Sequence, residues 1–212
     1  MTDTASTPLS TDALKAAVRA MAVAIIDHTE ELSRLDQAIG DGDHGLNMKR
    51  GFEAILAKLD GSADAPPALL KSIGTTLVMT VGGASGPLYG SLALAMGKAL
   101  GDQPLTLACA ADLLDAGIQS VMSRGRSQAG EKTMLDTLVP VLAVVRAGGA
   151  DLGDRVKAAA AAGAAATVPL RASKGRASFL GERSIGHMDP GARSSQLLIE
   201  ALCDALSKDP AP

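Results

Sequence analysis

Apolar residues recur every three or four positions along most of this chain, which is the spacing of an amphipathic α-helix. The first such segment follows a polar tail, residues 1–9, which we expect to be flexible. Ser10 or Thr11 can cap the start of the segment, and its apolar face continues past Leu32 before Gly40 ends it. This pattern predicts one long first helix.

Seven further segments show the same spacing, each bounded by glycine, proline or a capping residue. In one of them Ser85 would be the cap and Pro87 would open the helix. The stretch 168–193 lacks helical periodicity, and its Asp-Pro-Gly sequence favours an ordered loop. Eight helices with short connections predict an all-α single domain over residues 10–208. The six other helices are expected from just after His44 to about 59, and over about 69–81, 107–124, 133–147, 152–166 and from 194 onward. A turn is expected over 61–67.

The composition supports helices that approach one another closely. Hydrophobic residues make up 47% of the chain but aromatic residues only 1%, so alanine, leucine and valine must fill the core. Alanine is the best helix former, whereas strands favour β-branched and aromatic residues. The composition therefore agrees with the all-α prediction.

Charge and terminal sequence narrow the range of partners. A net charge of −3 and three aromatic residues argue against a nucleic-acid partner, because neither a basic field nor a stacking surface is available. The N-terminus lacks a signal-peptide pattern, and no apolar run reaches the roughly 20 residues that cross a bilayer. Cys109 and Cys203 read as free thiols of a reducing compartment. We therefore expect a cytoplasmic protein with no membrane partner.

Three aspartates and a histidine lie within nine residues, between two predicted helices: Asp36, Asp41, Asp43 and His44. Ionised carboxylates this close repel one another, and a hard divalent cation such as Mg²⁺ removes that repulsion. Three negative charges exceed what one Mg²⁺ needs, which indicates two cations or one cation with a phosphate-bearing ligand. Helix capping explains one aspartate but not three. A calcium EF-hand fails because Phe52 stands where glutamate is required.

A glycine-rich segment, residues 82–86, leads directly into a predicted helix start. Its accessible amides and the helix dipole suit a phosphate, although an ordinary turn with a serine cap explains the same residues. The P-loop pattern GxxxxGK[ST] is absent. His44 can bond a phosphate or an aspartate, and Arg176 and Arg183 can hold phosphates or stay solvated.

Four glycine-bearing connections separate alternate helices of the predicted array. Alternate connections of an up-and-down bundle lie at the same end, so we expect these four to meet at one rim and form one site. A single missed helix would place them at opposite ends. The four connections are 40–45, 82–86, 124–130 and 175–191.

Four motifs together resemble the L subunit of dihydroxyacetone kinase and the C-terminal domain of single-chain ATP-dependent dihydroxyacetone kinases: GDGDHGLNMKRGF, GGASGPLYG, GEKTMLD and GRASFLGERSIGHMDPGA. The resemblance runs from about Leu14 to the last helix and implies a barrel of eight antiparallel helices with a nucleotide at one rim. It implies that Asp36, Asp41 and Asp43 hold two Mg²⁺ ions on the phosphates of ADP or ATP. The implied nucleotide contacts are His44, Gly45, Leu46, Asn47, Ala84, Ser85, Gly125, Met134, Arg176, Asp189, Pro190 and Gly191. Of these, Gly125 and Met134 would line the adenine pocket, whereas Arg176 and the Asp189-Pro190-Gly191 turn would close over the nucleotide.

The resemblance also implies a phosphotransferase subunit that works with partners. A K subunit would hold dihydroxyacetone covalently through a histidine, and an M subunit of a phosphotransferase system would rephosphorylate the bound ADP. Three alternatives stay open: an ATP-using kinase subunit for another small ketose, a fatty acid kinase ATP-binding domain, and a nucleotide-loaded regulator without enzymatic activity. The resemblance allows a homodimer, and it implies no catalytic nucleophile in this chain.

Overall fold

The computed structural model describes residues 7–59, 61 and 65–208, and within them every regular element is a helix, apart from one isolated bridge between Pro8 and Thr106. The all-α prediction is confirmed. Two short 3₁₀ helices, η1 (Leu107–Cys109) and η2 (Arg176–Ser184), accompany nine α-helices in this part of the chain. The α-helices are α1 (Thr11–Asp27), α2 (Thr29–Ile39), α3 (His44–Leu59), α4 (Pro66–Thr80), α5 (Ser85–Leu100), α6 (Ala110–Gly125), α7 (Leu135–Ala147), α8 (Leu152–Ala166) and α9 (Pro190–Lys208).

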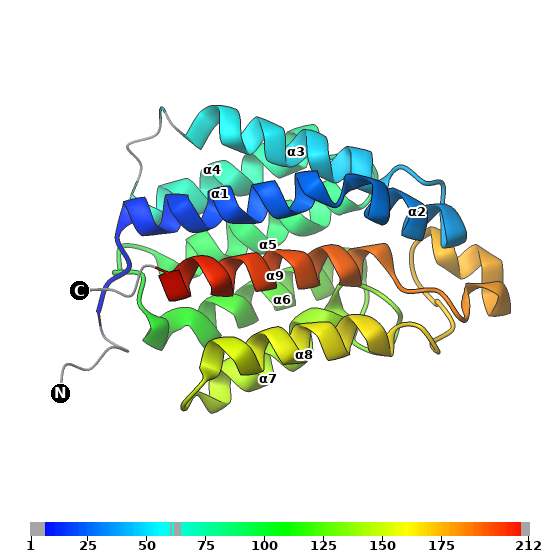
Figure 1. Ribbon diagram of the computed structural model, residues 1–212. Helices are drawn as coiled ribbons and strands as arrows, with labels where there is room; N and C mark the ends of the chain where they lie inside the picture. The colour runs from blue at the N-terminus through cyan, green and yellow to red at the C-terminus, as the bar shows by residue number, and fades with distance from the viewer. Residues whose placement is uncertain (1–6, 60, 62–64, 209–212) are drawn as a thin grey trace.

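The helices form a closed barrel (Figure 1). Each of α3 to α8 packs against the next helix along the chain, α1 packs against α3, and α9 returns to pack against α1. These eight helices close the ring that the resemblance implies. The described chain ends lie at one end of the barrel, whereas α2 and η2 lie at the other (Figure 1). No described helix has the length and apolar character needed to span a membrane.

The predicted long first helix is wrong in one respect, because it breaks at His28 into α1 and α2. His28 has φ −99° and ψ 16°, and its Nδ1 lies 2.8 Å from the carbonyl oxygen of Ala24. Thr29 Oγ1 donates to the carbonyl oxygen of Ile26 at 2.7 Å. These side chains compete for backbone acceptors of the helix and interrupt it. Because α2 continues toward the same end as α1 (Figure 1), the break does not reverse the order of the connections.

Two predicted helix starts are also wrong. The last helix begins at Pro190 rather than near Ser194, and Asp189 Oδ2 accepts a hydrogen bond from the Ala192 N–H at 2.7 Å. The Asp-Pro-Gly sequence is thus a capped helix start with proline at the first position, not a loop turn. Ser85 is the first residue of α5 rather than its cap, and its hydroxyl has another partner, His44.

The predicted tail and first turn fall partly outside the described residues. Of the tail, residues 1–6 are outside them, whereas Leu9 donates its N–H to the carbonyl oxygen of Leu105 at 2.7 Å. Residue 60, and residues 62–64 of the turn expected over 61–67, are likewise outside.

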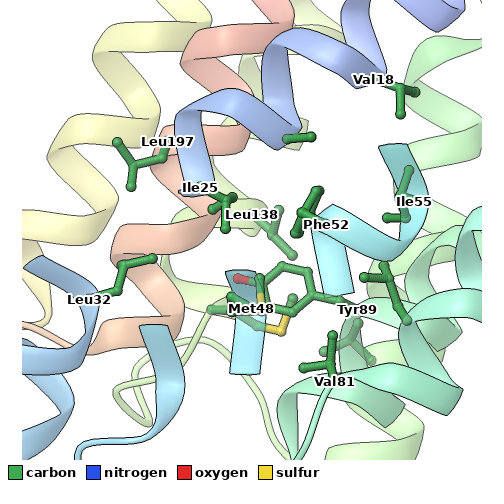
Figure 2. Packing of buried hydrophobic residues seen from close by; sticks show 14 of the residues in the cluster. Val18, Ile25, Leu32, Met48, Phe52, Ile55, Val81, Tyr89, Leu138 and Leu197 are labelled. Carbon is green, nitrogen blue, oxygen red and sulfur yellow. The ribbon is translucent and has the colours of Figure 1, made fainter. Parts of the chain in front are cut away.

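The core is aliphatic, with two aromatic rings at its centre. Figure 2 shows Met48, Phe52 and Tyr89 close together among leucine, isoleucine and valine side chains. Elsewhere the helices approach closely, since a Cβ added to Gly74 in α4 would lie 2.7 Å from the carbonyl oxygen of Gly90 in α5. The small-residue composition therefore permits the tight helix contacts that the sequence predicted.

Candidate functional site

The three predicted metal ligands meet where α2 leads into α3. Asp36 lies in the last turn of α2, and Asp41 and Asp43 follow in the connection. One carboxylate oxygen from each lies within 4.8 Å of the others. Asp36 is only 9% exposed, whereas the other two are open to solvent. The structure thus brings together the carboxylates that the sequence singled out.

Asp36 is held in place by the backbone around it. The His44 N–H donates to Asp36 Oδ2 at 3.1 Å. A Cβ added to Gly40 would lie 2.2 Å from Asp36 Oδ1, so only glycine allows this approach. Burial raises the pKa of Asp36, and the negative charges of Asp41 and Asp43 add to the rise, against the hydrogen bond from His44. These three carboxylates are hard oxygen donors, and their mutual repulsion disfavours ionisation. A divalent cation would relieve that repulsion, so the residues fit such an ion.

His44 joins the aspartate connection to two other helices. Its Nδ1 lies 3.0 Å from Ser85 Oγ at the start of α5, and its Nε2 lies 3.0 Å from Ser194 Oγ in α9. Burial lowers the pKa of His44 to about 4, so the imidazole is neutral at neutral pH. His44 was expected to bond a phosphate or an aspartate. It does bond Asp36, but the donor is its backbone N–H and not its ring.

The start of α5 lies beside this connection and presents a helix N-terminus. Gly83 and Ala84 are exposed there, ahead of Ser85. Asn47 reaches the same segment, since a Cβ added to Gly82 would lie 2.7 Å from Asn47 Oδ1. Asn47 Oδ1 also accepts a hydrogen bond from Arg50 at 2.6 Å. The glycine-rich segment and the aspartate connection therefore form one continuous surface.

Gly45 and Leu46 open α3 next to the aspartates. A Cβ added to Gly45 would lie 2.0 Å from the carbonyl oxygen of Thr29, so glycine lets α3 pack directly against α2. Leu46 is 61% exposed, which is unusual for a leucine beside a polar site. Gly45 and Leu46 are two of the residues for which the resemblance implies nucleotide contacts.

The second irregular region, η2, covers the aspartate connection. Ala177 packs with Ile39 of α2 in a small apolar cluster, and Arg176 Nη2 lies 2.9 Å from Asp41 Oδ2. Arg176 is therefore brought to the aspartates, as expected of a residue that closes over them. Arg183 is exposed.

Further expected nucleotide contacts come from the end of α6, the residue before α7 and the start of α9. Met134 is buried next to Gly191, whose added Cβ would lie 3.6 Å from Met134 Cβ. Gly125 ends α6, where its added Cβ would lie 3.4 Å from Leu88 of α5. Asp189 and Pro190 form the capped start of α9. Burial raises the pKa of Asp189 to about 7.

Sequence reasoning missed Tyr89, the only tyrosine of the chain. Its hydroxyl lies 2.7 Å from Ser194 Oγ and 2.8 Å from Ser195 Oγ, and it donates to the carbonyl oxygen of Gly191 at 2.9 Å. Burial raises the pKa of Tyr89 to about 12. Its position inside GGASGPLYG, in a chain almost without aromatic residues, was the available signal.

Sequence reasoning also missed Lys132 and Asp136, which lie inside the quoted motif GEKTMLD. Asp136 accepts hydrogen bonds from the N–H groups of Gly130 at 2.5 Å and Thr133 at 2.7 Å, which shapes the connection before α7. Lys132 is buried and bonds two backbone carbonyl groups, of Thr167 and His187.

Contacts join three of the four connections predicted to meet at one rim, and Lys132, two residues past the fourth, contacts His187 in one of them. The pairs are Asp41 with Arg176, His44 with Ser85, His44 with Ser194, and Lys132 with His187. The assignment of individual residues to metal or nucleotide stays a prediction.

Comparisons with known proteins agree with this geometry. The DAK2 domain family matches residues 38–204. The ADP-binding subunit DhaL of PEP-dependent dihydroxyacetone kinase 1 from Listeria innocua is 46% identical over 177 residues, covering 83% of this chain and 87% of that protein. The corresponding DhaL of Escherichia coli K12 is 42% identical over 182 residues, covering 82% and 87%.

A structural relative supports the same relationship. The crystal structure of the dihydroxyacetone kinase of C. freundii superposes with a TM-score of 0.76 and 25% identity. The match covers 96% of this chain and 36% of that one. The chain therefore belongs to the DAK2 domain family, together with the DhaL subunits of dihydroxyacetone kinases.

Proposed function

We propose that this chain binds ADP with Mg²⁺ and acts as the nucleotide-carrying phosphotransferase subunit of a dihydroxyacetone kinase. The observation that carries the proposal is the cluster of Asp36, Asp41 and Asp43 beside the N-terminus of α5. Carboxylates suit Mg²⁺, and a helix N-terminus suits a phosphate. The subunits with 46% and 42% identity are named ADP-binding, which agrees with this pairing.

Asp36, Asp41 and Asp43 would hold the metal, and because the phosphates of ADP add negative charge to theirs, two ions would balance the site better than one. When bound, Mg²⁺ supplies charge neutralisation for the phosphates during phosphoryl transfer. The residues of this chain would orient the nucleotide phosphates. Ser85 and the neighbouring amides face the anion, and Arg176 can move its guanidinium between Asp41 and a phosphate. His44 stays neutral and holds Ser85 in place.

The phosphoryl acceptor would be held by a separate K subunit, and a phosphotransferase M subunit would recharge the bound ADP. Support comes from the names of two relatives, since the DhaL proteins of Listeria innocua and Escherichia coli are subunits of PEP-dependent dihydroxyacetone kinases. Within this chain, the imidazole of His44 is occupied by two serine hydroxyls, so it does not offer itself as a covalent carrier.

A second candidate is an ATP-using kinase subunit for another small ketose. The L-erythrulose 1-kinase of Mycolicibacterium smegmatis is 36% identical over 191 residues, and the match covers 33% of its length. The higher identity to DhaL subunits favours the first candidate.

Native mass spectrometry of the purified protein tests the proposal. We expect one ADP with magnesium to stay bound through purification and to become ATP when the M subunit and its phosphoryl donor are added. Exchange with free nucleotide within seconds would favour the ATP-using alternative. Absence of any Mg²⁺-dependent nucleotide binding would refute both.

A further inference from the structure

Lys132 lies in an unusual environment for a lysine. It is only 1% exposed and is the largest fully buried side chain among the described residues, and its backbone has φ +62°. An ammonium group is costly to bury, and a left-handed backbone is costly for a residue with a Cβ. Because Lys132 carries both the cost of a buried ammonium and the cost of a left-handed backbone, its other interactions must compensate them.

The ammonium group is bound by backbone oxygens of two other connections. Its Nζ donates to the carbonyl oxygen of Thr167, just after α8, at 2.6 Å, and to that of His187, just before α9. The carboxylates of Asp136 and Asp189 supply the nearby negative charge, although burial still lowers the pKa of Lys132. The side chain therefore acts as a cation built into the protein.

The segments that Lys132 joins carry Met134, which is expected to line the adenine pocket, and Asp189, which is expected to close over the nucleotide. Met134 is two positions after Lys132, and Asp189 is two positions after His187. Gly191 then packs against Met134. A second tie fixes the same segment, because Thr167 Oγ1 accepts a hydrogen bond from the Asp189 N–H at 3.0 Å.

The aspartate side of the rim is positioned by other groups. His44 connects it to α5 and α9 through Ser85 and Ser194, and Arg176 reaches Asp41 from η2. The bonds of Lys132 go to Thr167 and His187 instead. The rim is thus supported by two sets of contacts, which meet where Ser194 of α9 reaches His44.

We infer that Lys132 is a positioning residue, which holds the segment 187–191 against Met134 and thereby sets the retention of the nucleoside part of ADP. The inference rests on the proposed function and adds that different residues support different parts of the bound nucleotide. Metal and phosphates depend on the aspartate side, whereas the nucleoside depends on the Lys132 side.

The test compares two ligands on the full chain in the presence of Mg²⁺: ADP and inorganic pyrophosphate, which has the phosphates without the nucleoside. Lys132→Met keeps the length of the side chain but removes its charge and donors. We expect it to weaken ADP binding by about tenfold or more, because hydrogen bonds from a charged group are lost, and to leave pyrophosphate affinity unchanged. Titration calorimetry measures both affinities.

Two further variants control for stability and folding. Lys157→Met removes another lysine that joins two helices, through Asp204, and should leave both affinities unchanged. Thr167→Val removes only the hydroxyl that accepts from Asp189, and should weaken ADP selectively by a smaller factor. This milder variant supplies the answer if Lys132→Met does not fold.

The outcomes separate the inference from the proposed function. Selective loss of ADP affinity supports the inference. Equal loss of both ligands, or unchanged ADP affinity in the two rim variants, would overturn it while leaving the proposed function intact. Failure of the unaltered protein to bind ADP would overturn the proposed function and the inference together.

Discussion

Two groups of carboxylates lie at the same end of the barrel, and each needs positive charge nearby. The open aspartate group consists of Asp36, Asp41 and Asp43, and its described cationic contact is Arg176, which is 67% exposed. In the internal-cation group, Asp136 and Asp189 lie near Lys132, whose ammonium is buried and bound by carbonyl oxygens. The open aspartate group is thus left to bind a cation from solution, whereas the other group is already supplied with one.

The presence of a buried lysine in only one group explains their different roles. The open aspartate group is a candidate ligand site, whereas the internal-cation group is a structural support. A carboxylate cluster without a buried partner gains from binding a divalent ion. A cluster that already encloses a lysine has no place for one. The same chemistry therefore has different uses according to where the protein places its own cation.

Asp41→Asn should have the largest effect, because it removes one ligand from the open aspartate group. We expect Mg²⁺-dependent ADP affinity to fall by about a hundredfold or more, with helix content unchanged. Calorimetry with ADP and Mg²⁺ measures the loss, and far-ultraviolet circular dichroism checks the fold. Asp154→Asn, on the exposed side of α8, is the matched control. Retained affinity in Asp41→Asn would remove the distinction between the two groups.

Asp189→Asn should change how stability depends on pH. Burial raises the pKa of Asp189 to about 7 in the folded state, above its value of 3.8 when unfolded. The stabilisation from this group is therefore complete below the unfolded pKa and is lost as the pH rises through the folded pKa. Asparagine keeps a good cap for α9 but does not titrate.

We expect the unfolding free energy of the unaltered protein, relative to Asp189→Asn, to fall by on the order of 3 kcal/mol between about pH 4 and about pH 7. Urea denaturation at several pH values measures this difference. A constant difference would contradict the prediction, because Asp189 would then titrate alike in the folded and the unfolded protein.

Gly40→Ala should disturb the open aspartate group without changing its charge. The added Cβ would lie 2.2 Å from Asp36 Oδ1, so the carboxylate must move. We expect Mg²⁺ affinity to fall by about tenfold, as for other changes that misorient a ligand. Gly153→Ala in α8 is the control, since the added Cβ would lie 3.9 Å from its nearest neighbour, Ser207 Oγ. Equal affinities in the two variants would show that the position of Asp36 is unimportant.

Tyr89→Phe should have the smallest effect, on stability alone. Its hydroxyl links α5 to Ser194, Ser195 and Gly191, and so connects the two sides of the rim through α9. We expect a loss of about 1–2 kcal/mol in unfolding free energy from the unpaired buried groups. Urea denaturation checks this, and an unchanged midpoint and slope would mean that the serines find other partners.

Much of the fold could be predicted from the sequence, because helical periodicity and capping are local. The segment 152–166 was bounded as α8 is, and the barrel followed from short connections and the resemblance. The break at His28 was missed because it depends on side chains that bond backbone carbonyls, which hydrophobic spacing does not record. The start of α9 was missed although Asp-Pro carried the capping signal.

The open aspartate group was easier to find than the internal-cation group for a physical reason. Asp36, Asp41 and Asp43 are close in the sequence, so their repulsion is visible there. Lys132 and Asp189 are separated by 56 intervening residues, and only the fold brings their charges together.

Anomalous diffraction from crystals grown with ADP and Mn²⁺ tests the central claim most directly, because it locates the metal itself. The account predicts anomalous peaks among the carboxylates of Asp36, Asp41 and Asp43, in contact with the diphosphate, and none beside Lys132. A nucleotide bound elsewhere, with no metal at those aspartates, would contradict it.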